Sequence, residues 1–243
     1  MIKLKLNKFR SRIYFKIKPT IFEIFSLNEY IQCKYTKNIF GFNRSVKYTK
    51  LIDLTLSEEE ILNNFKKNTR YDIRKSEMDG NIFITNNKFD IFVDYYNDFA
   101  EKKGLTILDK ENFKEQFLSS NILITSIVND KEILAMHSYM IDKTINRVRL
   151  WYSASIFRQF EKQSLNRNIV ARANKSLHYQ DIKVFKSKGY LLYDFGGYAY
   201  NTDSSDLIGI NNFKDQFGGE LVEESNYTTF IYYILKKIKT YLT

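Results

Sequence analysis

Hydrophobic and polar positions alternate along several stretches of the chain, and this spacing predicts strands. In residues 12–18, Ile13, Phe15 and Ile17 alternate with more polar neighbours, as in a strand with one buried face. Alternation, or short apolar runs bounded by turn residues, predicts further strands at residues 30–40, 46–54, 81–85, 122–128, 132–141, 145–153 and 191–195. Short turns join the three strands between residues 122 and 153, which indicates an antiparallel meander.

Apolar residues spaced three or four apart predict the helices. Ser57 and Glu60 form an S-x-x-E capping box, so we expect a helix that begins there and runs to about Met78. A long helix is predicted over residues 165–188, where Gly189 ends it. Other helices are predicted at residues 89–103, 110–118 and 211–217, and residues 220–234 should form one or two strands or a helix.

This order of elements indicates an α/β (α+β) domain with a mixed, mostly antiparallel sheet flanked by helices. The long helix connects the meander with the strand at residues 191–195, and ligand crevices commonly open beside such a crossover. We divide the chain into a section of residues 1–50, expected to form strands, and a main domain of residues 51–243.

Positive charge is concentrated at the start of the chain. The 243 residues hold 38 Lys and Arg against 28 Asp and Glu, a net charge of +10. Residues 1–50 hold 12 of these cations against only Glu23 and Glu29, so they carry the whole net charge. We expect an anionic partner there: a membrane surface, a nucleic acid, an acidic carrier protein or a phosphorylated substrate. A Lys-rich genome is the alternative explanation.

Composition excludes several kinds of site. Cys33 is the only cysteine, and His137 and His178 are the only histidines, so disulfide frameworks, multi-cysteine metal sites and three-histidine metal sites are ruled out. We expect no metal, and a reducing compartment. No stretch is apolar enough for a signal peptide or a membrane span, which favours a cytoplasmic protein. The apolar and cationic residues 231–242 could lie at the inner face of the membrane or pack on the core.

Three cations share one edge of the helix predicted from residue 57. Lys67, Arg70 and Arg74 recur at spacings of three and four, so their side chains should form a row. Such a row can clamp a diphosphate or a nucleic-acid backbone, since arginine offers forked donors and lysine a point charge. An ordinary solvated helix face is the alternative.

The segment LLYDFGG at residues 191–197 places a carboxylate at the end of a strand. Asp194 could accept or orient the proton of an attacking amine. Phe195 and the paired Gly196 and Gly197 follow it, and glycines allow a backbone or ligand to approach closely. A turn-capping aspartate is the alternative.

The segment GINNFKDQFGGE at residues 209–220 places Lys214 between Phe213 and Phe217, which should anchor it to the core. A fixed ammonium there could stabilise an oxyanion, whereas the alternative is an ordinary surface lysine. On the meander, His137, Tyr139 and Tyr152 complete the candidate substrate-binding residues, together with Phe195, Gly196, Gly197 and Phe213. For His137, a packed core histidine is the expected arrangement. No motif of a serine hydrolase, P-loop NTPase, Rossmann dehydrogenase or zinc protease is present.

These segments resemble transferases of the FemA/FemB/FemX type. Residues 65–80 are similar to a family helix that reads K-x-x-R-x-x-I-R-x-A-x-x-x-G. Residues 192–197 and 209–223 resemble its Y-D-F-G-G and G-I-x-x-F-K-x-x-F-G-G-E segments, and a long helix again precedes the first of these. The resemblance spans about residues 55–230.

The resemblance implies the GNAT acyltransferase fold, which this family usually carries as two domains in tandem. It also implies transfer of an amino acid from aminoacyl-tRNA to an amine of a peptidoglycan precursor, or acylation of an amino sugar of a surface polysaccharide. By the same resemblance, Lys214 would stabilise the oxyanion, and Arg70 and Arg74 would hold phosphates. The chain has room for one full GNAT-like domain, with residues 1–50 as a remnant of the first half or as extra strands, so a homodimer could complete the cleft.

We therefore expect a transferase that forms an amide on an amino group of a cell-envelope precursor, with no bound cofactor. The expected partners are a phosphorylated precursor and an anionic donor, either aminoacyl-tRNA or an acyl-carrier protein. Acyl-CoA is a less favoured donor, because residues 157–167 lack the glycine loop that cradles its pyrophosphate in CoA-dependent members. The alternatives are an acyl-CoA-dependent GNAT N-acyltransferase and a non-catalytic GNAT-fold module that binds nucleic acid or membrane.

Overall fold

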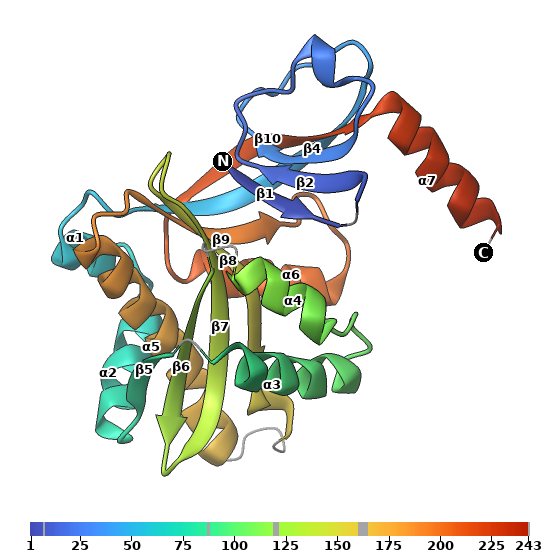
Figure 1. Cartoon of the computed structure of the whole chain (residues 1–243). Helices are drawn as coiled ribbons and strands as arrows, with labels where there is room; N and C mark the ends of the chain where they lie inside the picture. Colours follow the sequence, from blue (N-terminus) through green and yellow to red (C-terminus); the bar gives the residue numbers. More distant parts are fainter. Residues whose placement is uncertain (7, 87, 119–121, 160–164, 243) are drawn as a thin grey trace.

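The computed structural model describes residues 1–6, 8–86, 88–118, 122–159 and 165–242. Within them, the strands join into one ten-stranded sheet of order β1-β2-β3-β10-β4-β9-β8-β7-β6-β5 (Figure 1). The β2–β3 and β8–β9 pairs are parallel and the other neighbours antiparallel, which confirms the predicted mixed, mostly antiparallel sheet. The strands are β1 (Ile2–Lys5), β2 (Arg10–Tyr14), β3 (Leu27–Cys33), β4 (Phe42–Asp53), β5 (Ile82–Asn86), β6 (Ile122–Asn129), β7 (Glu132–Asp142), β8 (Arg147–Ser155), β9 (Leu192–Tyr198) and β10 (Glu220–Thr229).

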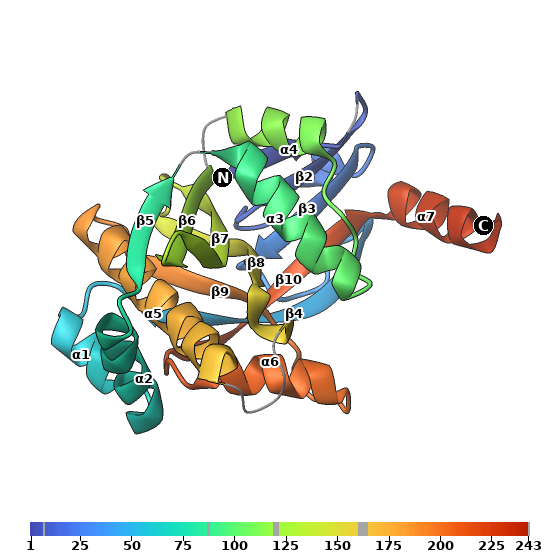
Figure 2. The same cartoon turned by 90° about the horizontal axis from the view of Figure 1, so that it is seen from below.

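Helices cover both faces of the sheet around β7. Figure 2 shows α3 and α4 on one face and α5 with α1 and α2 on the other. The helices are η1 (Ile21–Glu23), α1 (Glu58–Asn63), α2 (Lys67–Met78), α3 (Phe89–Lys102), α4 (Lys110–Gln116), η3 (Ile156–Gln159), α5 (Leu165–Ser187), α6 (Ser205–Asp215) and α7 (Phe230–Leu242). None of those described is both long and apolar enough to cross a membrane.

The single helix predicted from residue 57 is in fact two helices. Its start is confirmed: the Ser57 side chain accepts a hydrogen bond from the Glu60 amide, and the Glu60 carboxylate accepts one from the Ser57 amide. The break comes where Phe65 is buried against Phe217, with ring centroids 5.2 Å apart. There the Lys66 amide donates to the carbonyl of Gln216 at 2.8 Å, so a tertiary contact replaces the bond within the helix.

Both ends of the chain differ from the predicted elements. The first predicted strand corresponds to β2, and β1 precedes it. The helix predicted at residues 211–217 is α6, which begins six residues earlier at Ser205. Residues 220–234 divide between β10 and α7, so a strand and a helix are both present.

The basic N-terminal section contributes β1, β2, β3 and most of β4. Strand β10 lies between β3 and β4, so the last strand of the chain joins the early strands to the rest of the sheet. Strand β4 runs from Phe42 to Asp53 without interruption and also pairs with β9. Residues on both sides of position 50 therefore share one strand.

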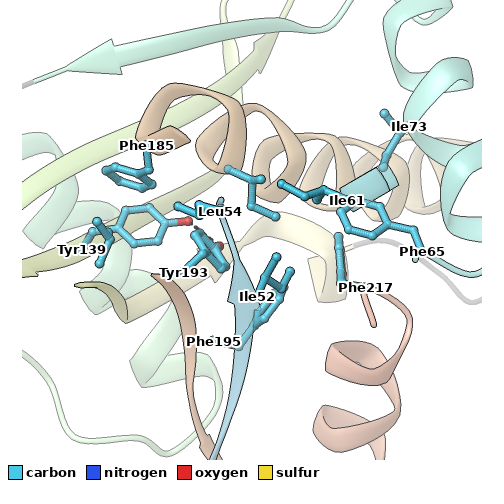
Figure 3. Packing of buried hydrophobic residues seen from close by; sticks show 12 residues of the cluster. Ile52, Leu54, Ile61, Phe65, Ile73, Tyr139, Phe185, Tyr193, Phe195 and Phe217 are labelled. Carbon is cyan, nitrogen blue, oxygen red and sulfur yellow. Dashed lines mark hydrogen bonds between the residues drawn. The ribbon is translucent and has the colours of Figure 1, made fainter. Parts of the chain in front are cut away.

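The main hydrophobic core lies between α5 and the sheet. In Figure 3, Phe65 and Phe217 pack against each other at one end of this core. At the other end, Tyr139 and Tyr193 turn their hydroxyl groups toward each other below Phe185. Aromatic burial of this kind stabilises the fold, but it also places polar hydroxyls deep in the core, where each needs a hydrogen-bond partner.

Candidate active site

A cavity opens where β8 and β9 stop pairing. The two strands are parallel neighbours only from Arg147 to Arg149 on β8, opposite Leu192 to Asp194 on β9. Beyond these residues lies an open cavity of about 630 Å³, bounded by β8, β9, α3, α5 and α6. The cavity lies beside the crossover through α5, where the sequence predicts a crevice.

Six of the predicted site residues line this cavity: Tyr152, Phe195, Gly196, Gly197, Phe213 and Lys214. Others that line it come from α3, β8 and α5, and include Tyr96, Phe99, Lys103, Arg149, Trp151, Asn174 and His178. The walls are therefore mainly aromatic, with a few polar and cationic groups. This composition is typical of a site that buries an organic group and orients it through a small number of charges.

Lys214 is a buried cation at the wall of the cavity. Its side chain reaches back from α6, and Nζ donates to the carbonyl oxygens of Gly196, at 3.3 Å, and of Gly197. Burial lowers the pKa of Lys214 to about 8; the charge of Asp194 opposes this lowering, and Arg149 adds a smaller lowering. Because Lys214 makes no ion pair within the described residues, its charge is available to an oxyanion.

A β-bulge in β9 aims the two carbonyl groups at Lys214. The register shifts between Thr49 and Leu51 on β4, so β9 carries an extra residue there. Gly196 has a positive φ of 74°, and a Cβ at this position would meet the carbonyl oxygen of Leu150 at 3.2 Å. The Thr49 hydroxyl holds the bulge by sharing its one proton between the carbonyl oxygen of Gly196, at 2.9 Å, and the carboxylate of Asp194. Glycine is therefore required here by both conformation and space.

Asp194 is fully buried and does not line the cavity. Its carboxylate accepts hydrogen bonds from Arg147 at 2.6 Å, from Gln32 at 3.0 Å, from the Gly196 amide at 2.7 Å and from the Thr49 hydroxyl. Burial alone would raise the pKa of Asp194, but Arg147, Arg149 and these hydrogen bonds lower it overall. Both oxygens are occupied by donors, so this arrangement favours a structural role for Asp194 in holding the bulge.

His137 and Tyr139 lie beneath the cavity and are both completely buried. Nδ1 of His137 lies 2.8 Å from a carboxylate oxygen of Asp181, and Nε2 lies 3.1 Å from the side-chain oxygen of Asn174. Tyr139 donates to Asp181 at 2.5 Å. Neither side chain can touch a molecule in the cavity without rearrangement, and both belong to a hydrogen-bonded network described below.

The cationic edge of α2 is separate from the cavity. Lys67 and Arg74 are exposed, and neither lines the cavity. Arg70 donates to the carbonyl oxygens of Asn63, at 3.0 Å, and of Phe65, at 2.5 Å. Its guanidinium thus satisfies the carbonyl group of the last residue of α1 and one in the turn that follows, which is a local structural contact. Any phosphate bound by this edge would lie outside the cavity.

Arg149 and His178 line the cavity but are not among the site residues predicted from the sequence, where His178 is only a weaker candidate on the long helix. Arg149 is mostly buried, and its Nε has no hydrogen-bond partner in the described part of the chain. It supplies a second cation next to Lys214. The sequence contains a signal for both residues. An arginine inside a strand and a histidine on the apolar stripe of the long helix are polar groups at buried positions, and burying such groups costs free energy unless they have partners.

Among the described residues, His137, His178 and Asp181 could together offer metal ligands, since their ligand atoms lie within 4.8 Å of one another. The Nδ1 atoms of both histidines and one carboxylate oxygen are, however, already occupied by hydrogen bonds within the network. The other carboxylate oxygen, Oδ1 of Asp181, is buried and has no hydrogen-bond partner in the described part of the chain. The segment expected to lack a pyrophosphate-binding loop, residues 157–167, includes residues 160–164, which lie outside the described residues.

Solved structures share this fold. FemX matches with a TM-score of 0.63 and 14% identity over 82% of this chain and 68% of its own. The C-terminal domain of a putative lysylphosphatidylglycerol synthetase from Agrobacterium fabrum matches at 0.59, with 11% identity over 93% and 79% of the two chains. L-PGS from Bacillus licheniformis matches at 0.56, with 11% identity over 91% and 78%.

No protein-family model and no curated protein matches the sequence. The structural matches therefore rest on the arrangement of the elements. At these identities they establish the fold, whereas activity has to be argued from the site. The chain has a FemX-like fold of the GNAT type, as its sequence segments predict.

Proposed function

We propose that this chain is an acyl- or aminoacyl-transferase that forms an amide on an amino group of a cell-envelope precursor. The observation that carries the proposal is the buried ammonium of Lys214 at the wall of an aromatic cavity between the diverging strands β8 and β9. A peptidoglycan peptide or an amino sugar of a surface polysaccharide would supply the amine.

The chemistry needs a positive charge at one fixed point. When an amine attacks the carbonyl of an ester or thioester, a C–N bond forms and negative charge develops on the carbonyl oxygen. The C–O or C–S bond to the leaving group then breaks. Lys214 and Arg149 would stabilise the oxyanion, since a preorganised and largely buried charge is more effective than a charge in solvent.

We infer that the donor is an aminoacyl-tRNA or an acyl-carrier protein, with acyl-CoA as the alternative. A neighbour of the same fold is named for the synthesis of lysylphosphatidylglycerol, which supports transfer of an aminoacyl group. The charge of +10 in residues 1–50 suits an anionic macromolecule. The exposed Lys67 and Arg74 could contact phosphates of the donor or of the precursor.

We also propose that the protein works at the inner face of an anionic membrane. Helix α7 projects from the molecule (Figure 1) and exposes Ile231, Ile234, Leu235 and Ile238, each between 41% and 49% accessible. At the start of α7, the Phe230 amide donates a hydrogen bond to the carbonyl oxygen of Gly41, which follows the exposed Phe40. An apolar helix face with basic surroundings suits the interface of anionic lipids.

The test is a panel of donors with the purified protein. Radiolabelled aminoacyl-tRNA, acyl-carrier protein and acetyl-CoA would each be incubated with a soluble peptidoglycan precursor and with an amino sugar nucleotide, and base-stable amide would be measured by mass spectrometry. We expect product from tRNA or carrier protein. Lys214→Met should lower the rate by about 10²–10³-fold, as loss of an oxyanion donor does, whereas Lys188→Met, an exposed lysine remote from the cavity lining, should not.

Two outcomes would replace this function with an alternative. Product from acetyl-CoA, together with a saturable thermal shift by CoA, would identify a CoA-dependent N-acyltransferase. A ligand at 100 times its dissociation constant stabilises by about 2.7 kcal/mol, so the shift would be plain. Absence of product from every donor, with salt-sensitive binding of nucleic acid or of lipid vesicles, would identify a non-catalytic module.

A further inference from the structure

A chain of hydrogen bonds runs from the cavity into the core through four buried side chains. His178 Nδ1 lies 2.7 Å from the Tyr193 hydroxyl, which lies 2.9 Å from the Tyr139 hydroxyl. Tyr139 in turn donates to Asp181 at 2.5 Å. Figure 3 shows the two tyrosines with their hydroxyl groups facing each other. Tyr139, Tyr193 and Asp181 are fully buried, so water cannot reach them, whereas His178 is 2% accessible and lies at the wall of the cavity.

The number of protons available fixes which group donates in each hydrogen bond of this network. Burial, followed by the charge of Asp181, raises the pKa of Tyr139 and of Tyr193 well above its usual value, so each hydroxyl keeps one proton. Tyr139 uses its proton for the carboxylate of Asp181, which can only accept. Tyr193 must therefore donate to Tyr139, and it can then only accept from His178.

It follows that the proton of His178 sits on Nδ1 and that Nε2 keeps a free electron pair. Nε2 has no hydrogen-bond partner within the described part of the chain, and His178 is one of the residues that line the cavity. Burial, with help from His137 and Lys214, holds the pKa of His178 well below its usual value, which keeps the ring neutral. The rings of Phe195 and Phe213 flank it at 5.0 and 5.5 Å.

We propose that His178 is the base of this site, with Nε2 facing the cavity as proton acceptor and with Tyr193, Tyr139 and Asp181 as positioning residues that hold the opposite proton on Nδ1. The catalytic part of this inference rests on the proposed acyl transfer. The tautomer of His178 does not, because it follows from the hydrogen bonds alone.

The transfer step then balances. The amine nitrogen bonds to the carbonyl carbon and loses one proton to Nε2 of His178. As the C–O or C–S bond of the donor breaks, the same proton passes from Nε2 to the leaving oxygen or sulfur, and the neutral ring returns. Lys214 stays charged throughout beside the carbonyl oxygen. Asp181 stabilises the transient imidazolium through the two tyrosines, as a carboxylate behind a histidine does elsewhere.

The decisive measurement is the nitrogen NMR spectrum of the full chain labelled with ¹⁵N-histidine at pH 7. The sequence has only two histidines, so two ring patterns are expected, and His137→Gln assigns them. We expect His178 in the neutral Nδ1–H form, with a pyridine-type shift at Nε2. Tyr193→Phe removes the acceptor for Nδ1 and should move the ring proton to Nε2. Tyr190→Phe, at a half-buried tyrosine that is not part of this hydrogen-bond network, should leave the spectrum unchanged.

An Nε2–H tautomer or an imidazolium at His178 in the unaltered protein would overturn the inference, as would a pattern that Tyr193→Phe leaves unchanged. An Nε2–H tautomer would mean that the hydrogen bonds of this network run in the opposite direction.

The catalytic role of His178 is tested with the donor and acceptor that give product in the donor panel described above. His178→Gln should lower the single-turnover rate by about 10²–10⁴-fold, and free imidazole should restore part of it in His178→Gly. A rate within a few-fold of the unaltered protein would overturn the role as base. If no donor gives product, the role of His178 as base is overturned together with the proposed function. The NMR result still decides which tautomer His178 adopts. If the protein gives product while His178 is in the Nε2–H form, the transferase function is supported and the role of His178 as base is overturned.

Discussion

At the scale of single residues, the site combines two buried charges that differ in how far neighbouring groups compensate them. Asp194 is surrounded by donors and by Arg147, so its charge is fully compensated. Lys214 meets only carbonyl oxygens and lies near Arg149, so its charge is poorly compensated. The first arrangement builds a stable bulge, and the second leaves a cation that gains stability when negative charge develops beside it.

The titration of Lys214 should reveal this contrast. Its pKa in the folded chain, about 8, lies below the usual 10.5, so the folded state disfavours the charged form. Stability should therefore rise as pH increases from about 8 toward 10.5, and transfer should decline over the same range as the ammonium is lost. NMR of ¹³C-dimethylated lysines should show one resonance that titrates near pH 8 and disappears in Lys214→Arg. Titration of every lysine above pH 9.5 would contradict the assigned environment.

The same reasoning predicts that Lys214→Met stabilises the protein at pH 7. Removing a disfavoured buried charge should raise the free energy of unfolding by up to ~3 kcal/mol, although the same substitution lowers the transfer rate. Denaturant unfolding measures this, with Lys188→Met as the exposed control. A destabilised Lys214→Met variant would mean that the two carbonyl contacts, and not desolvation, dominate at this position.

Asp194→Asn should have the opposite effect on stability. The substitution leaves the buried guanidinium of Arg147 with only Glu224 as a charged partner, and it weakens the acceptor for Thr49 and Gly196. Breaking a buried pair in this way costs about 3–5 kcal/mol. Unfolding by urea at pH 7 is the measurement, and Asp203→Asn, at an exposed aspartate, is the control that should stay within ~0.5 kcal/mol. A loss below 1 kcal/mol for Asp194→Asn would show that the bulge does not depend on this charge.

At the scale of elements, the divergence of β8 and β9 makes the cavity, and α7 makes the exposed apolar surface. Helix α7 packs one face on the early strands, where Tyr232 is buried and Lys236 pairs with Glu29. Its other face carries Ile234, Leu235 and Ile238 toward solvent. An apolar stripe of this length is unfavourable in water and favourable in the head-group region of a bilayer.

Replacing Ile234, Leu235 and Ile238 by serine should weaken binding to vesicles of phosphatidylglycerol and phosphatidylcholine. Each buried side chain contributes on the order of 1 kcal/mol or more, so at least a tenfold loss in cosedimentation is expected. The sheet is untouched, and the circular dichroism of the core should be unchanged.

The matched control replaces three exposed apolar residues elsewhere, Met78, Leu118 and Ile145, by serine, which should leave vesicle binding intact. If the α7 variant bound vesicles normally but lost a dimer in solution, the face would belong to a second copy of the chain and the membrane proposal would fail.

At the scale of the whole molecule, charge is separated from the neutral body. The net charge of +10 falls within residues 1–50, which form β1, β2, β3 and most of β4 at one end of the sheet. Long-range attraction of this kind steers an anionic macromolecule to one part of the surface and weakens with salt. The cavity between β8 and β9 lies in the neutral part of the same sheet.

Binding of tRNA should therefore depend on the early strands. Replacing the exposed Lys3, Lys5 and Lys34 by alanine should reduce affinity at low salt and lower the slope of log K against log salt by roughly two units, if these cations meet phosphates. Fluorescence anisotropy with labelled tRNA measures both quantities. Replacing Lys131, Lys143 and Lys188, exposed lysines of the neutral body, removes the same charge and should have a smaller effect. Equal losses in the two variants would show that net charge, and not its position, controls binding.

Local patterns were sufficient for most elements and for part of the site. The capping box at Ser57, the long helix before Gly189 and the meander depend on residues close in sequence, so their signals could be read directly. The placement of Lys214 between the half-buried Phe213 and the buried Phe217 also has a local cause. The segments around it were enough to predict the FemX-like fold.

Long-range contacts decided the rest. The helix break at Phe65 comes from residues about 150 positions later, and the full burial of Asp194 comes from Arg147 and Gln32 on other strands. Likewise, the role of His178 depends on hydroxyl groups from β7 and β9 and on Asp181 one turn further along α5. Spacing along one element can reveal which face is buried, but the pKa of a group and the direction of its hydrogen bonds depend on neighbours that only the folded chain brings together.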